Sequence, residues 1–123
     1  MNRTLLAGAF FGLTGVAAAA YANHGIDAAL VDKVMSGVRL QQIHGLVLVA
    51  TGFAAYGNLP GNMARRLKIA AVLFSLGIVL FSGNIYLSNF LGFTALKFLI
   101  PFGGITIIAG WLALMWAALS RKN

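Results

Sequence analysis

Four long stretches of the chain contain no Asp, Glu, Lys or Arg. They cover residues 4–26, 40–64, 69–96 and 98–120. Each is longer than the roughly 18 apolar residues that mark a helix able to span a bilayer. Within them we place membrane spans at residues 4–22, 40–57, 69–91 and 98–119. The pattern predicts an all-α membrane protein, a four-helix transmembrane bundle forming a single integral membrane domain over residues 1–123.

The connection between the first two spans, residues 23–39, has a pattern of its own. Apolar side chains recur every four residues from Ile26 to Val38, while charged side chains point in other directions. This is the pattern of an amphipathic helix. We expect a short helix that lies along the membrane interface, covers the bundle and turns into the second span near Gly37. Docking of a partner onto this helix is the alternative.

Composition supports the membrane assignment and excludes several kinds of site. The chain is 60% hydrophobic and 9% charged, whereas a soluble domain has about 25% charged residues. Its net charge of +7 comes from residues at the ends of the apolar stretches, so no clustered basic face for nucleic acid is expected. The absence of cysteine excludes disulfides, iron–sulfur clusters, thiolate metal sites and cysteine nucleophiles.

The basic residues also predict an orientation. With the N-terminus inside, the inner side carries six of them: Arg3, Arg65, Arg66, Lys68, Arg121 and Lys122. The outer side carries three: Lys33, Arg39 and Lys97. Because Lys and Arg accumulate in cytoplasmic loops, we expect both termini to be cytoplasmic.

The first span also has the features of a secretory signal peptide. Arg3 is followed by an apolar core and by Ala20-Tyr21-Ala22, which resembles a cleavage site. We interpret the segment as an uncleaved first span.

Small residues predict where helices approach one another, because little else drives helix association in lipid. The first span carries a G-x-x-x-G pair, and the last span carries glycines seven residues apart after a proline suited to a helix start. The candidate helix-packing residues are Gly8, Gly12, Gly15, Pro101, Gly103, Gly104 and Gly110. We expect packing within one bundle, with an oligomer seam as the alternative.

Uncharged polar residues gather toward the outer ends of the predicted spans. The candidate outer-leaflet polar cluster is His24, Gln41, His44, Ser82, Asn84, Tyr86 and Asn89. Uncompensated polar side chains are costly in hydrocarbon, so these groups should face one another or a wet cavity. One interpretation is a small pocket lined by five of them, namely His24, Gln41, His44, Asn84 and Tyr86. The other is a hydrogen-bond cluster that only holds the helices together.

The same residues carry a family resemblance. The matching motifs are Ala22-Asn23-His24-Gly25, Gln41 with His44-Gly45-Leu46, Phe81-Ser82-Gly83-Asn84-Ile85-Tyr86-Leu87, and Pro101-Phe102-Gly103-Gly104 followed by Gly110-Trp111. With them the chain resembles the small inner-membrane proteins of the UPF0382 group, domain of unknown function 423, whose eukaryotic relatives include transmembrane protein 256. The resemblance implies a multi-pass protein of the bacterial inner (plasma) membrane with its N-terminus inside. It implies no activity.

The usual equipment of enzymes and pumps is missing from the sequence. There is no G-x-S-x-G, H-E-x-x-H or P-loop motif, and the only two carboxylate side chains, Asp27 and Asp32, lie in a connection. A coupled transporter of this size should carry an ionisable residue within a span, a role left here to the histidines. We therefore expect no enzyme activity, no catalytic residue, no metal and no cofactor.

By elimination, we expect an accessory or structural subunit, or a stabiliser, of a larger membrane protein complex within the lipid bilayer. Two alternatives stay open. One is a small-molecule or ion transporter or channel that acts as a homo-oligomer. The other is a haem- or ligand-binding protein that uses His24 and His44, which the predicted spans place at similar depth.

Overall fold

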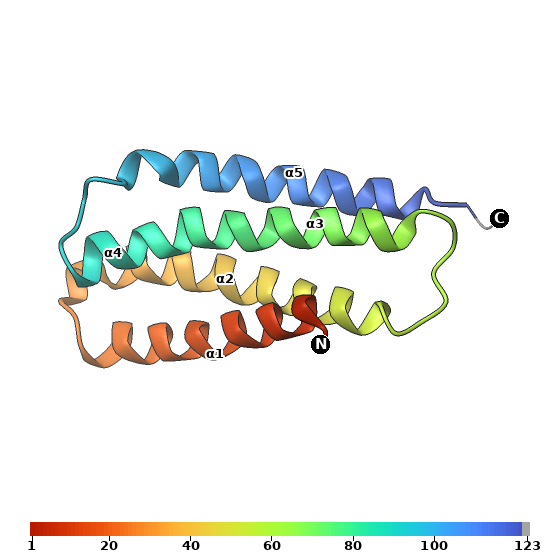
Figure 1. The fold of residues 1–123 in the computed structure, drawn as a ribbon. Helices are drawn as coiled ribbons and strands as arrows, with labels where there is room; N and C mark the ends of the chain where they lie inside the picture. The colour runs from red at the N-terminus through yellow and green to blue at the C-terminus, as the bar shows by residue number, and fades with distance from the viewer. Residues whose placement is uncertain (122–123) are drawn as a thin grey trace.

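The structure, a computed structural model, describes residues 1–121, and this part of the chain contains helices and no strand. Four long helical stretches run alternately up and down a bundle (Figure 1). The first two are α1 (Arg3–His24) and α2 (Ala28–Ala54). The third consists of α3 (Met63–Ile78), the π-helical turn η1 (Val79–Gly83) and α4 (Asn84–Phe90). The fourth consists of the 3₁₀ turn η2 (Lys97–Leu99) and α5 (Ile100–Ala118). The predicted all-helical bundle is confirmed.

Three of these stretches are long and apolar enough to cross a membrane. They are Arg3–His24, Met63–Phe90 and Lys97–Ala118. The span predicted at residues 40–57 falls mostly in α2, which ends at Ala54 and is not among the three. Insertion of all four stretches therefore stays a prediction.

The segment 23–39 differs from its prediction. Residues 28–39 are helical, but α2 continues unbroken through Gly37 to Ala54, so the predicted turn near Gly37 and the separate interfacial helix are wrong. Val34 and Val38 are fully buried and cluster with alanines of α1. An amphipathic pattern shows only that one face of the helix is shielded from water, by lipid or by protein. In this protein, neighbouring helices cover it.

The two ends of the bundle differ in charge. The N-terminus, the α2–α3 connection and the end of α5 lie together, and the other two connections lie at the opposite end (Figure 1). Five cationic side chains belong to the first of these, which we call the basic end: Arg3, Arg65, Arg66, Lys68 and Arg121. Lys122, counted with them above, lies outside the described residues.

Local capping explains where the helices begin. The Asn2 side chain accepts from the Leu5 amide at 3.0 Å, which caps α1, and donates to the Gly52 carbonyl at 2.8 Å, which ties α1 to α2. Asp27 caps α2 by accepting from the Ala29 amide. Pro101 lies in the first turn of α5, where its missing amide hydrogen costs no helical bond.

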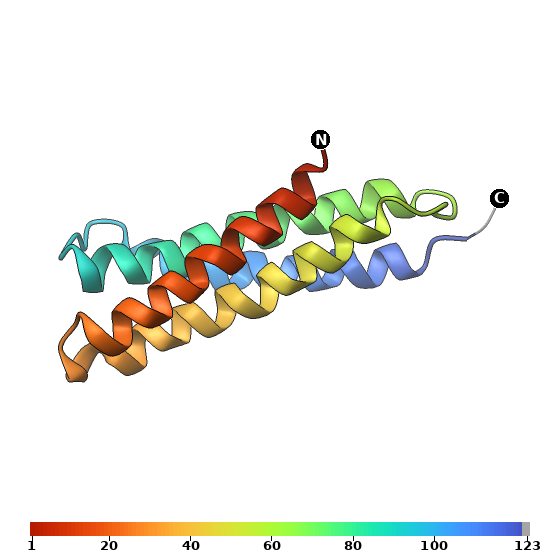
Figure 2. The same ribbon diagram turned by 90° about the horizontal axis from the view of Figure 1, so that it is seen from below.

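The helices pack as two close pairs, α1 with α2 and α3 with α5 (Figure 2). Glycines allow the close approach. A Cβ on Gly8 would come within 2.6 Å of the Val49 amide nitrogen, and one on Gly103 within 2.6 Å of the Phe81 amide nitrogen. Gly110 similarly contacts the Phe74 ring. Gly15 has more room, because a Cβ there would lie 3.1 Å from the flexible Gln42 side chain.

Two glycines assigned to helix packing have open space where a side chain would begin. A Cβ on Gly12 or on Gly104 would meet nothing within 4 Å in the described chain. The Gly12 amide nitrogen does lie near Gly45 of α2. Its Cα–Cβ direction, however, points away from that helix. The spacing of Gly8 and Gly12 thus identified the side of α1 that faces α2, but not which of the two glycines is packed against it.

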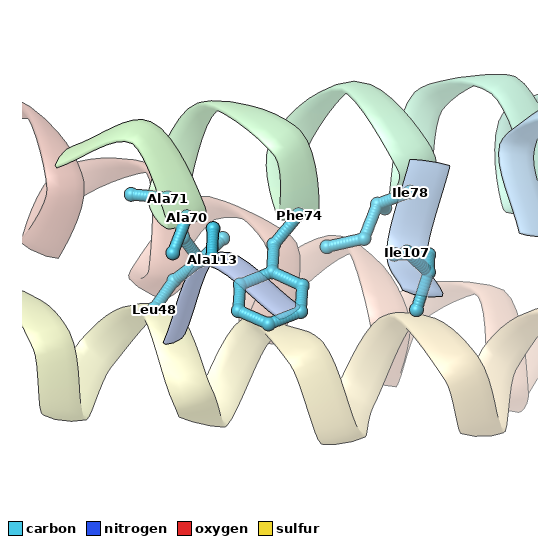
Figure 3. Close-up of a cluster of buried hydrophobic side chains, with 7 residues drawn as sticks. All are labelled: Leu48, Ala70, Ala71, Phe74, Ile78, Ile107 and Ala113. Atoms are coloured by element: carbon cyan, nitrogen blue, oxygen red, sulfur yellow. The ribbon is translucent and has the colours of Figure 1, made fainter. Parts of the chain in front are cut away.

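Apolar side chains fill the space between the pairs. Figure 3 shows Phe74 of α3 at the centre of this core, between Leu48 of α2 and Ile107 of α5. Phe74 and Leu48 are fully buried. This core fixes the positions of the polar side chains of α2.

Candidate functional site

Gln41 links three helices through one buried amide. Its Nε2 donates to the Phe11 carbonyl at 2.9 Å and to Thr14 Oγ1 at 2.7 Å, both on α1. Its Oε1 accepts from the Tyr86 hydroxyl of α4 at 2.6 Å. The side chain is only 2% exposed, so both ends of the amide are satisfied without water.

His44 joins α2 to α5. Its Nδ1 lies 2.7 Å from the Leu40 carbonyl oxygen, which can only accept, so Nδ1 carries the hydrogen. Its Nε2 then accepts from the Trp111 indole N–H at 2.9 Å. The imidazole also packs against the Phe74 ring, with centroids 5.3 Å apart. Both ring nitrogens are therefore occupied, and one tautomer is selected.

Ser82 connects α2 to the π-helical turn η1. Its hydroxyl is fully buried and donates to the Gly37 carbonyl at 2.7 Å. On the same turn, the Phe81 backbone lies against Gly103 of α5. We call the six residues Thr14, Gln41, His44, Ser82, Tyr86 and Trp111 the interhelical polar network. Its hydrogen bonds connect α2 with α1, η1, α4 and α5.

The remaining members of the predicted outer cluster do not join this network. Asn84 donates to the Leu80 carbonyl and Asn89 to the Ile85 carbonyl, so each bonds its own helix. His24 is exposed at the end of α1. The five residues predicted to line one pocket thus separate: Gln41 meets Tyr86, and His44 meets Trp111.

The predicted similar depth of His24 and His44 is wrong. Because α2 begins at Ala28, close to the end of α1, sixteen residues separate its start from His44. At about 1.5 Å per residue, His44 lies about 24 Å further along the bundle. Two histidines so far apart cannot ligate one haem, and His44 already uses both nitrogens. Within residues 1–121, no group of three or more His, Cys, Asp or Glu could hold a metal ion.

Sequence reasoning missed two members of the network. Thr14 was not among the candidate site residues, and it donates to the Phe10 carbonyl of its own helix while also accepting from Gln41. Trp111 entered the sequence analysis only through the Gly110-Trp111 motif, yet it lies mid-span and is the hydrogen-bond partner of His44. A mid-span indole needs a partner for its N–H. That was the available signal, although it could not name the partner.

The comparisons with known proteins assign the family. Residues 18–104 match the family described as "Protein of unknown function (DUF423)". The chain belongs to this family. The segment that matches the family model therefore includes every network residue except Thr14 and Trp111.

Individual UPF0382 relatives are similar over nearly the whole chain. A UPF0382 membrane protein of Staphylococcus haemolyticus is 33% identical over 94% of this chain and 93% of its own. A UPF0382 membrane protein of Haemophilus influenzae is 30% identical, covering 99% and 98%. The UPF0382 inner membrane protein YgdD of Escherichia coli is 31% identical, covering 97% and 91%. No solved structure matches the chain significantly.

The His44 bond leads to a first prediction for this UPF0382 protein. His44→Ala should lower the free energy of unfolding by about 2 kcal/mol, because it removes a buried ring and leaves the Trp111 N–H unpaired. Thr51→Ala is the control, since Thr51 bonds only the Val47 carbonyl of its own helix. Thermal unfolding in mild detergent measures both. Equal effects of the two substitutions would show that the His44–Trp111 bond does not stabilise the bundle.

Proposed function

We propose that this UPF0382 protein inserts all four helical stretches into the membrane and serves as an accessory or structural subunit, or a stabiliser, of a larger membrane protein complex. The observation that carries the proposal is the distribution of polarity. Buried Gln41, His44 and Ser82 bond other helices, so these polar groups serve to assemble the bundle. Their hydrogen-bonding atoms are already paired within the bundle, so they do not form an open substrate site.

The outside of the bundle supports membrane insertion of α2 as well. The outward side chains of α2 include Ile43, Leu46 and Phe53, which are 56%, 70% and 60% exposed. Two of the residues that lower its hydropathy, Gln41 and His44, face other helices, whereas Gln42 is exposed. A helix surrounded by neighbours can span lipid with polar residues on its covered side.

The exposed face of α1 suits a protein partner. Leu6, Phe10 and Leu13 are 57%, 56% and 71% exposed, and Gly12 on the same helix has open space at its Cβ position. Small residues beside large apolar ones allow a second transmembrane helix to approach closely. An accessory subunit needs such a face.

For location and orientation, we propose the bacterial inner membrane with both termini in the cytoplasm. The relative from Escherichia coli is named an inner membrane protein. The cationic side chains of the basic end outnumber those elsewhere, which supports placing that end in the cytoplasm.

Single cysteines test the orientation without background, because the chain has none of its own. Thr94→Cys, in the α4–α5 connection, should react with a membrane-impermeant maleimide in intact spheroplasts. Asn58→Cys, in the α2–α3 connection, should react only after the membrane is opened. Both positions are exposed, so each serves as the other's control. The reverse labelling pattern would invert the orientation, and labelling of both from one side would contradict four spans.

The accessory role is tested by gentle extraction. Native sizing followed by mass spectrometry of the chain expressed at its natural level should find it together with a much larger membrane protein. Gly12→Ile should release it from that partner, whereas Ala118→Ile, at an exposed position near the end of α5, should not. A particle that contains only copies of this chain would overturn the accessory role and favour a homo-oligomeric transporter or channel.

A further inference from the structure

An apolar groove runs between α1 and α3 on one side of the bundle. It has a volume of about 590 Å³ and extends from Arg3 and Lys68 at the basic end to Phe11 on α1 and Val79 on α3. Its lining is mostly apolar, and α1 and α3 make few contacts with each other. The groove therefore lies where the two helix pairs are not in close contact.

A second hollow, of about 520 Å³, adjoins the groove at the basic end. Its lining is more polar and includes Asn2 and Tyr56. The two hollows share Arg3, Thr4 and Lys68. A polar hollow and an apolar groove thus meet at two cations, which matches the form of a phospholipid with its headgroup, phosphate and acyl chain in that order.

The groove has the length of one leaflet. Eleven residues separate Lys68 from Val79 along α3, a rise of about 16 Å at 1.5 Å per residue. Half of a hydrocarbon core of about 30 Å is about 15 Å. An acyl chain that begins at Lys68 would end near the bilayer centre. A partner helix crossing the whole membrane would extend well beyond the groove.

The charge at this end favours an anionic headgroup. Arg3 and Lys68 line both hollows, and the only carboxylate side chains of the protein, Asp27 and Asp32, lie at the opposite end of the bundle. Basic pockets between transmembrane helices on the cytoplasmic side are suited to anionic lipid headgroups.

We propose that the groove between α1 and α3 is a binding site for one anionic phospholipid. Arg3 and Lys68 hold its phosphate, and an acyl chain lies along Phe11, Val72 and Val79. The site requires membrane insertion but no partner protein, so it stands or falls separately from the accessory role.

Native mass spectrometry of the purified full chain tests the site with two lipids of identical acyl chains, phosphatidylglycerol and phosphatidylcholine. Each basic residue near a membrane surface contributes about fivefold in binding an anionic lipid, so phosphatidylglycerol should bind roughly 25-fold more tightly. Inorganic phosphate at the same concentration should not displace it, because it lacks the acyl chain. Equal binding of the two lipids, or displacement by phosphate alone, would overturn the proposal.

Matched variants separate the site from net charge and from general lipid contact. Arg3→Gln/Lys68→Gln should abolish the preference, whereas Arg39→Gln/Lys97→Gln, which removes the same charge elsewhere, should keep it. Val72→Trp should fill the groove and weaken both lipids, whereas Leu112→Trp, at a residue equally exposed at 61% but outside the groove, should not. Equal lipid binding by the two members of either pair would overturn the site. In a labelling experiment on Val72→Cys, protection of the cysteine by a copurified protein, in place of lipid, would overturn it as well.

Discussion

Gly103→Ala is expected to lower the free energy of unfolding by about 3 kcal/mol, the upper end for overpacking a close interface. The added methyl group would lie 2.6 Å from the Phe81 amide nitrogen and 2.9 Å from the Leu80 carbonyl carbon. Both are backbone atoms, which cannot rotate away as a side-chain end can. η1 and α5 would have to separate. Tryptophan fluorescence during thermal unfolding in mild detergent measures the loss.

The adjacent glycine provides the control. A methyl group on Gly104 meets nothing within 4 Å, and alanine is favoured over glycine in a helix by up to about 1 kcal/mol. Gly104→Ala should therefore unfold at the same temperature as the original protein or slightly above it. If the two substitutions had equal effects, the close approach of α5 to η1 would not be a source of stability.

Gln41→Ala is expected to cost at least about 2 kcal/mol of unfolding free energy, because three interhelical hydrogen bonds are lost at roughly 0.6 kcal/mol each and a cavity adds to that loss. The loss includes the hydrogen bond that the Tyr86 hydroxyl of α4 donates to Gln41. The same fluorescence measurement applies. Gln42→Ala is the control, since Gln42 is the next residue along α2 and is exposed. It should change stability by less than about 0.5 kcal/mol.

A double variant shows whether the bonds act as a network. Tyr86→Phe removes one of the three bonds of Gln41, so adding it to Gln41→Ala should cost less than the sum of the single losses. Strict additivity would mean that Tyr86 stabilises the bundle by a route other than Gln41.

The positions of the helices could be predicted from sequence because a single physical quantity decides them. A charge-free stretch of about 20 residues is what a bilayer requires, and α1 and the last stretch follow the predicted limits closely. The third stretch begins six residues before its predicted start, at Met63, and so includes Arg65, Arg66 and Lys68. The start of α2 could not be predicted in this way. Residues 28–39 carry charges, and their apolar face would suit a membrane surface as well as it suits α1 and α4.

The network was only partly predictable for a related reason. Polar type and helical spacing identified Gln41, His44, Ser82 and Tyr86 as inward-facing residues. Pairing depends on how far each helix is shifted along its neighbours, and that shift follows from where α2 begins. With α2 starting at Ala28, His44 moves away from His24 and toward Trp111, which is 67 residues distant in sequence.

The π-helical turn η1 changes which side of the third helical stretch each side chain faces, so that the side chains before and after it point in different directions. A π turn holds one residue more than an α turn, which offsets the residues after it by about 100° relative to a continuous α-helix. Before η1, Gly77 faces α5, and after it, Tyr86 reaches Gln41 of α2. Deleting one residue between Val79 and Gly83 would restore a uniform helix and rotate one half away from its partner. The number of residues in this segment therefore decides whether both halves of the stretch can contact their partners.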